Sequence, residues 1–178
     1  MATVVGLCSD KRVIGPKLHS VIDIVDGQQR LTTLVLLLKA IERKLACSQP
    51  DDARDLQRLL VKGDDLALIL LQTNHDSSNY CANYLRYGDA PAVSDAQTLA
   101  DKTLLNAIHE CKSFVDKWNY PMELLTIVQN QLHFIFYQIT NEASVHTVFE
   151  TLNDRGLDVS WLDKLKNRLM AVYFYHQA

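Results

Sequence analysis

The change of hydrophobic period around residues 24–34, IVDGQQRLTTL, constrains the fold more than any other feature of the chain. The residues leading into it, SVIDIV at 20–25, are mostly apolar and β-branched, as expected of a strand. After it, apolar residues recur at steps of three and four, which predicts an amphipathic helix. These residues are Leu31, Leu34, Leu38, Ile41 and Leu45. We therefore expect a strand that turns through Gly27 directly into a helix, in a domain that contains both kinds of element.

Two more strands are expected from runs rich in β-branched and aromatic residues. The first is ATVVGL at 2–7, separated from the strand at 20–25 by a polar stretch that contains Gly15 and Pro16. The second is QLHFIFYQI at 131–139. Three short strands predict a small sheet.

The runs LQRLLV at 56–61 and LALILLQT at 66–73 are too short for periodicity to separate a β-hairpin from two helical pieces. The intervening Gly63-Asp64 is typical of a turn and favours two strands. The charged run DDARD at 51–55 is interpreted as a solvated helix start.

Helices are expected at 76–87, from Thr98 to Trp118, and from Pro121, which suits a first helical turn. Helical spacing returns over 145–152, and Ser160 is a suitable N-cap for a last helix. The predicted fold class is α+β, with a small sheet that carries the turn at Gly27 and a packed helical region.

Composition narrows the class of protein. At 178 residues and 48% hydrophobic content, the chain is long enough for a single domain, 1–178, with its own core. A net charge of -3 and a pI near 6.0 argue against a broad basic surface, so any contact with nucleic acid must come from local positive groups or from a partner.

The four cysteines form no C-x-x-C pair and the six histidines no H-x-x-x-H spacing, so we expect neither a disulfide framework nor a protein metal site. No apolar run approaches the roughly 18 residues of a membrane span and no export signal is recognisable, so a cytoplasmic protein that makes no membrane contact is expected.

The expected turn has the chemistry of an anion site. The first four N–H groups of a helix lack intrahelical partners, and the peptide dipoles add about half a positive charge there. Gly27 lets the backbone turn tightly, while Gln28, Gln29 and Arg30 offer side-chain donors and Thr32 a hydroxyl. The helix dipole disfavours an arginine in that turn by roughly 0.3–1 kcal/mol, so a negative group should compensate Arg30.

A purely structural arrangement is the alternative. Asp26 can cap the helix, with Gln29 completing a D-x-x-Q capping box, while Arg30 pairs with a carboxylate elsewhere. Neither a Walker A loop nor a G-x-G-x-x-G fingerprint is present in the sequence.

Two long motifs, VDGQQRLTTLVLLL at 25–38 and VFETLNDRGLDVSWLDKLKN at 148–167, carry a family resemblance. Together they resemble the N-terminal domain of GmrSD-type restriction endonucleases, the DGQQR family with a ParB/sulfiredoxin-like core. The resemblance implies a domain that binds and hydrolyses a nucleoside triphosphate, GTP, UTP or ATP with magnesium. It also implies a role in modification-dependent DNA restriction and phage defence.

The resemblance implies roles for residues in both motifs. Asp26 and Glu150 are the expected catalytic residues, which hold a magnesium ion through water or orient the attacking water. Arg30 and Arg155 suit phosphate oxygens because a guanidinium binds them with two parallel hydrogen bonds. The expected nucleotide-binding residues are Gly27, Gln28, Gln29, Arg30, Thr32, Asn153, Arg155 and Lys166.

In the second motif too a structural arrangement is possible, in which Glu150 and Asn153 form a helix end and Arg155 pairs with an acid. The family's usual first strand, its Y-Q-R-x-Y-x-W-like segment and its His-Asn-His (HNH) nuclease half are not found in the sequence, so DNA is expected to be reached through an HNH-type nuclease partner. Two other functions remain open: a non-catalytic nucleotide or anion sensor that signals to a nuclease, and a truncated fragment without activity.

Overall fold

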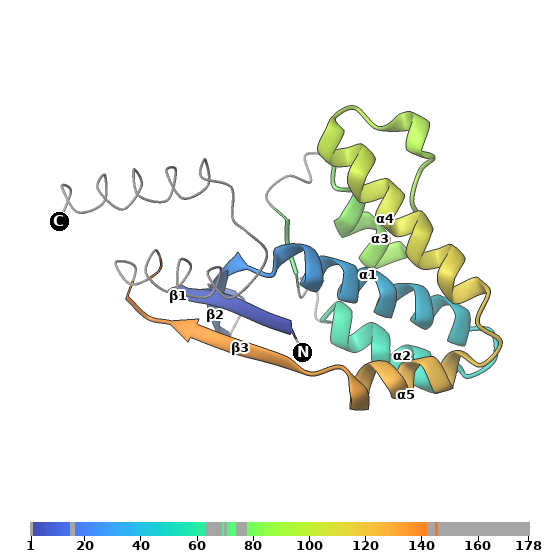
Figure 1. The fold of residues 1–178 in the computed structure, drawn as a ribbon, viewed down its shortest axis with the longest axis horizontal. Coiled ribbons are helices and arrows are strands. Elements are labelled where there is room, and N and C mark those ends of the chain that lie inside the picture. Colours follow the sequence, from blue (N-terminus) through green and yellow to red (C-terminus); the bar gives the residue numbers. More distant parts are fainter. Residues whose placement is uncertain are drawn as a thin grey trace. The chain divides into compact units, whose positions relative to one another are not determined.

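The computed structural model describes residues 2–14, 17–62, 69, 71–73, 78–141 and 145 (Figure 1). The chain divides into two compact units. One comprises Met1–Gln28 and His133–Ala178 and is here called the sheet unit; the other comprises Gln29–Leu132 and is called the helical unit.

The sheet unit contains three strands, β1 (Ala2–Ile14), β2 (Lys17–Asp26) and β3 (Phe134–Ile139). Their order is β2-β1-β3, with β1 antiparallel to β2 and parallel to β3. The strands predicted at 2–7, 20–25 and 131–139 are confirmed. The first two extend further than predicted, because residues assigned to a polar loop pair across the hairpin as far as Ile14 and Lys17.

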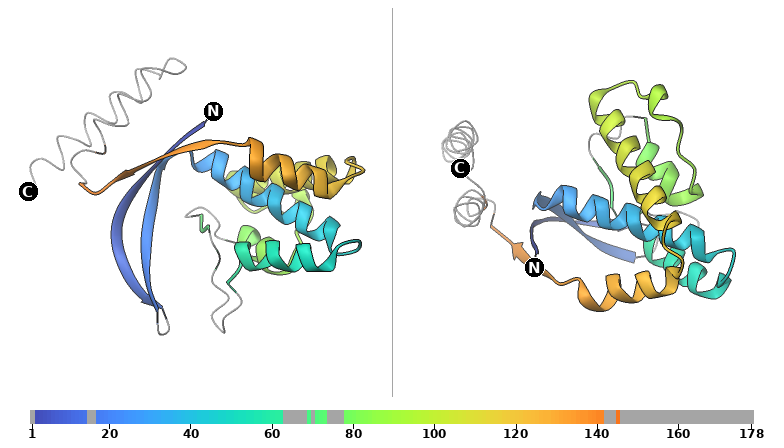
Figure 2. Two further views of the ribbon diagram at one scale, coloured as in Figure 1. Left: turned by 90° about the horizontal axis from the view of Figure 1, so that it is seen from below. Right: turned by 45° about the vertical axis from the view of Figure 1, so that its right-hand side comes forward.

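The helical unit is built from α1 (Gln28–Leu45), α2 (Pro50–Leu60), α3 (Tyr80–Tyr87), α4 (Leu99–Asp116) and α5 (Pro121–Gln131), with a short 3-10 turn at Val93–Asp95. Figure 2 shows the five helices gathered together. Buried residues from all of them form one hydrophobic core. The periodic apolar stripe of α1 supplies Leu38, Ile41 and Leu45 to it. The α+β class is therefore confirmed, whereas the ParB/sulfiredoxin-like core stays a prediction.

The predicted strand at 56–61 is wrong, because residues 50–60 form α2. Pro50 occupies the first turn, where its missing N–H is not needed. Two aspartates in the same turn interact favourably with the positive end of the helix dipole and so stabilise the helix. Ala53, Leu56 and Leu60 then follow at helical steps and are all buried. Val61 makes an isolated bridge to Ile69. Of the second predicted strand, residues 66–68 and 70 lie outside the described residues, and residues 69 and 71–73 belong to no named strand.

The other predicted helices in the middle of the chain are present. Thr98 caps α4, since its hydroxyl accepts from the Asp101 N–H at 3.0 Å while the Asp101 carboxylate accepts from the Thr98 N–H at 3.1 Å. Pro121 opens α5 as expected. The helices predicted beyond 145 lie outside the described residues. Within the part of the chain that the structure describes, no helix is long and apolar enough to cross a membrane.

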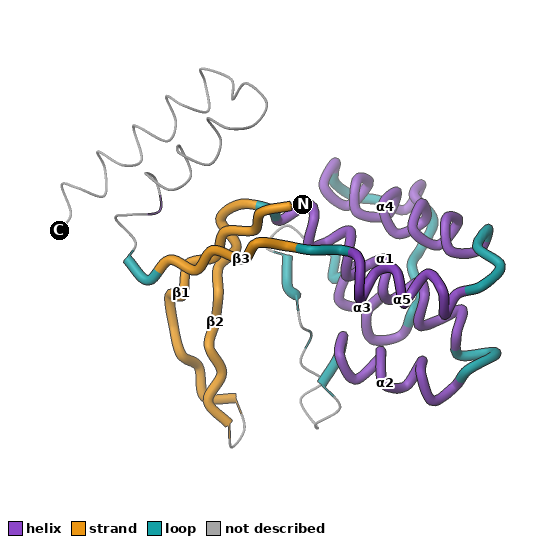
Figure 3. The backbone as a smooth tube through the Cα atoms, turned by 60° about the horizontal axis from the view of Figure 1, so that its bottom comes forward, coloured by secondary structure: helices purple, strands orange, loops and turns teal. Residues whose placement is uncertain are grey.

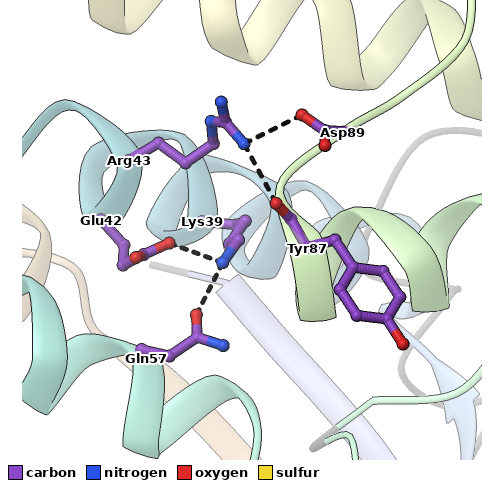
Figure 4. Close-up of polar contacts among 6 residues, drawn as sticks. All are labelled: Lys39, Glu42, Arg43, Gln57, Tyr87 and Asp89. Atoms are coloured by element: carbon purple, nitrogen blue, oxygen red, sulfur yellow. Dashed lines mark hydrogen bonds and ion pairs between the residues drawn. The ribbon is translucent and has the colours of Figure 1, made fainter. Parts of the chain in front are cut away.

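Cationic side chains on α1 tie α2, α3 and α4 to it, and Figure 4 shows the contacts of Lys39 and Arg43. Buried Lys39 donates to Gln57 Oε1 of α2 at 2.6 Å and pairs with Glu42 at 2.6 Å. Arg43 donates to the Tyr87 carbonyl at the end of α3 at 3.2 Å, and Lys44 donates to three carbonyls at the end of α4. Because helix ends carry unpaired carbonyls and partial negative charge, these two cations complete α3 and α4.

Candidate functional site

The candidate site is the turn that connects β2 to α1. Asp26 is the last residue of β2, Gln28 is the first of α1, and Gly27 lies between them with a φ of 88°. A Cβ on Gly27 would lie 3.0 Å from Val4 Cγ2 and 3.1 Å from the Thr3 carbonyl oxygen. Any other residue here would adopt a disfavoured backbone conformation and crowd β1, so this turn requires glycine.

The first turn of α1 presents donors and no acids. Gln28, Gln29 and Arg30 are exposed, and Thr32 is half-buried. Gln28 Nε2 donates to the Ile24 carbonyl of β2 at 2.6 Å, which ties the start of the helix to the end of the strand. Because no carboxylate lies in this first turn, its positive end is not neutralised from within the helix.

Asp26 closes β2 opposite Val5 of β1 and is half-buried. The residue directly before α1 is Gly27, so Asp26 and Gln29 each lie one position away from the cap and third positions that a capping box requires. Asp26 therefore does not occupy the cap position itself, and both Asp26 and Arg30 interact with other groups of the protein.

Comparison with known protein families supplies the decisive observation. Residues 10–170 match the family described as GmrSD restriction endonuclease, N-terminal domain. The chain belongs to this family. Neither the curated proteins nor the solved structures contain a match to it.

The GmrSD match spans the strand-to-helix turn and the second motif, so both fall inside the family's domain. Of the residues predicted to form the site, the structure describes those of the first motif. Glu150, Asn153, Arg155 and Lys166 lie outside the described residues, and their roles stay predictions. Among the described residues, no group of three or more His, Cys, Asp or Glu side chains is arranged to hold a metal ion.

The sequence pattern did not reveal two features of this turn. The first is the contact of Gly27 with Thr3 and Val4, which depends on the pairing of β1 with β2. The second is the bond from Gln28 to Ile24, which uses one of the donors assigned to the ligand. A side chain four residues from a strand carbonyl gives no periodic signal, so only the structure shows this bond.

Proposed function

We propose that this GmrSD-family domain binds a nucleoside triphosphate with magnesium at the β2–α1 turn and hydrolyses it in support of modification-dependent DNA restriction. Membership of a restriction endonuclease family supports the restriction role. The observation that carries the nucleotide site is the turn itself: a glycine with positive φ leads into a helix whose exposed first turn holds donors and no acid.

Electrostatics favours a phosphate group as the ligand of this turn. The N-terminal N–H groups of α1 and the helix dipole attract an anion, and exposed Arg30 can grip two oxygens of one phosphate. Gln29 is exposed beside it and offers both an amide donor and an acceptor. These groups together favour a ligand with several phosphate oxygens over a single carboxylate.

Hydrolysis requires a magnesium ion and a positioned water. We assign Asp26, at the end of β2, to the magnesium ion through a bound water, since carboxylate oxygens are preferred magnesium ligands. Glu150 of the second motif is the proposed partner that orients the attacking water, and Asn153, Arg155 and Lys166 are proposed to complete the nucleotide contacts. An HNH-type nuclease domain or subunit is the proposed recipient of the signal.

Calorimetric titration with GTP, UTP and ATP in magnesium tests the binding step. Arg30→Ala should weaken binding at least tenfold, because a charge-assisted hydrogen bond contributes about 1.5–3 kcal/mol. Arg54→Ala is the matched control, since the Arg54 side chain on α2 is 62% exposed and, within the described residues, pairs with Asp51 one turn away. Equal affinities for the wild type, Arg30→Ala and Arg54→Ala would refute the site.

Magnesium-dependent phosphate release then tests hydrolysis. Asp26→Asn should retain nucleotide binding but lower the release rate by at least tenfold, because the amide is a poorer magnesium ligand. Binding without release by the wild type would identify a nucleotide sensor instead of an enzyme. A folded chain that neither binds a nucleotide nor releases phosphate would contradict both the enzyme and the sensor.

A further inference from the structure

An open cleft of about 650 Å³ lies beside α3 in the helical unit. Its lining comes from α3 and from the segment that follows this helix: Tyr80, Asn83, Tyr87, Asp89, Ala90 and Pro91. The three residues from α3 share one face of the helix, because they are three, four and seven positions apart. Gly88 ends α3 with a φ of 77°, and the three residues after it complete the lining.

Both ends of this lining are anchored to other parts of the helical unit. The Tyr80 hydroxyl donates to the Asp95 carbonyl at 3.3 Å, which ties the ring to the 3-10 turn Val93–Asp95. The Pro91 carbonyl accepts from His109 Nε2 of α4 at 2.9 Å. The cleft is therefore formed by the fold itself, as ligand sites usually are.

The exposed groups of the cleft are aromatic and acidic. The Tyr87 side chain is 70% exposed, and Figure 4 shows its ring pointing away from Arg43. The Asp89 side chain is 85% exposed. Within the described residues, Arg43 binds only its Oδ1, at 3.3 Å, through an Nη1 that also donates to the Tyr87 carbonyl. No Lys or Arg belongs to the lining, so the charge that a ligand meets there is negative.

This combination of groups suits a guanidinium. A guanidinium is a flat and weakly hydrated cation, so it stacks on a tyrosine ring while its N–H groups bind a carboxylate. The exposed Asn83 amide offers a further acceptor between the two rings. A lysine ammonium is more strongly hydrated and does not stack, and a phosphate would be repelled by Asp89.

We propose that this cleft binds an arginine side chain of a partner protein, with the guanidinium stacked on the Tyr87 ring and paired with Asp89. Electrostatic complementarity favours such a partner, because the chain has a net charge of -3 and the lining holds a carboxylate and no cation. Arginine and tyrosine are also enriched among the residues that dominate binding energy at protein interfaces. The cleft shares no residue with the β2–α1 turn, so the proposal is independent of the nucleotide site.

NMR titration of the ¹⁵N-labelled full chain with N-acetyl-L-argininamide tests the proposal, since its blocked ends resemble an arginine within a protein. The amide signals of residues 80–91 should shift and saturate. N-acetyl-L-citrullinamide has nearly the same shape without the charge and should bind about threefold more weakly or worse. Free L-arginine should bind no more tightly than the blocked form. The absence of a saturable shift at these residues, equal binding of the citrulline compound or tighter binding of free arginine would overturn the proposal.

A pair of double variants locates the contact. Tyr87→Ala/Asp89→Asn should weaken binding about fivefold or more, because it removes both the stacking and the ion pair. Tyr120→Ala/Asp51→Asn is the matched control, since Tyr120 is also 70% exposed, Asp51 is 90% exposed and the net charge changes equally. The control should change affinity less than about twofold, and equal losses in the two double variants would overturn the proposal. Circular dichroism of both should match the wild type, because all four side chains are exposed.

Discussion

The helical unit and the sheet unit differ in how they treat their apolar and cationic side chains. In the helical unit, apolar stripes from five helices meet in one core, and cations of α1 bind the ends of α3 and α4. In the described sheet unit, β3 leaves four consecutive apolar or aromatic residues between 36% and 49% exposed. The outer part of the β1–β2 hairpin, residues 10–14 and 17–21 and here called the hairpin arm, extends past β3 as a two-stranded ribbon (Figure 3) and exposes Val13 and Leu18 further.

The helical unit also exposes large apolar residues, such as Leu99 and Tyr120, but these stand apart from one another in the sequence, whereas those of β3 are consecutive. Because grouped exposed apolar surface favours partner binding, we treat the helical unit as the scaffold and propose the sheet unit as the recognition surface. The cleft beside α3 is the one part of this scaffold to which we assign a partner.

The largest expected contrast is between core and arm. Ile41→Ala should lower the free energy of unfolding by about 2–5 kcal/mol, because Ile41 is fully buried in the helical core. Val13→Ala, on the exposed arm, should change it by less than about 0.5 kcal/mol. Urea denaturation of the two variants measures both values, and losses of similar size would show that the arm is packed as tightly as the core.

A smaller effect is expected where α3 ends. Gly88 has a φ of 77°, and a Cβ there would overlap the Arg43 guanidinium and lie 2.7 Å from Arg43 Cδ. Gly88→Ala should therefore cost about 1–3 kcal/mol, from backbone strain and from displacement of Arg43. The double variant Gly88→Ala/Arg43→Ala should lose less stability than the sum of the losses in the two single variants, by about 0.5–3 kcal/mol. Strict additivity would show that Arg43 does not hold this helix end.

Much of this architecture was predictable because it is local. The helices from Thr98 and Pro121 and the strand-to-helix change at Gly27 follow from period and capping chemistry. The strand prediction at 56–61 was wrong because it considered the apolar run alone. With Ala53 included, the buried residues Ala53, Leu56 and Leu60 are spaced by three and four positions, which is helical spacing.

What could not be predicted depends on contacts between distant residues. Polar residues of the hairpin arm look like a loop, and only their cross-strand partners make them strands. The turn motif located the candidate site, yet the constraint on Gly27 comes from Thr3 and Val4 of another strand. Likewise, Lys44 and the carbonyls of α4 are more than 70 positions apart, and no local pattern relates them.

The next prediction concerns the C-terminal end of α4, where Lys44 of α1 binds backbone carbonyls. Lys44 Nζ donates to the carbonyls of Val115 at 2.8 Å, Asp116 at 2.9 Å and Trp118 at 2.6 Å. Lys44→Met keeps an unbranched chain but removes these bonds, and should cost about 1–2 kcal/mol in urea denaturation. Arg58→Met removes, among the described residues, an exposed ion pair with Asp55 and should cost less than about 0.5 kcal/mol. Equal losses would mean that Lys44 contributes no more than a surface ion pair.

The smallest expected difference between the two units is in the reactivity of their cysteine thiols. Burial raises the pKa of Cys111 in the helical unit, and the nearby Glu110 carboxylate raises it further. Because the thiolate is the reactive form, a raised pKa lowers its fraction at pH 8, and burial restricts access as well.

Iodoacetamide at pH 8 should therefore label exposed Cys47 first, then half-buried Cys8 of the sheet unit, and the buried Cys81 and Cys111 last. Mass spectrometry of the labelled protein gives the order, and urea should bring the rates together because unfolding removes both causes. The Cys111 rate should also rise more steeply between pH 8 and 9 than would follow from an ordinary thiol, since its titration lies higher. Labelling of Cys111 as fast as Cys8 in the native protein would mean that the helical unit opens as readily as the sheet unit, and the division into scaffold and recognition surface would fail.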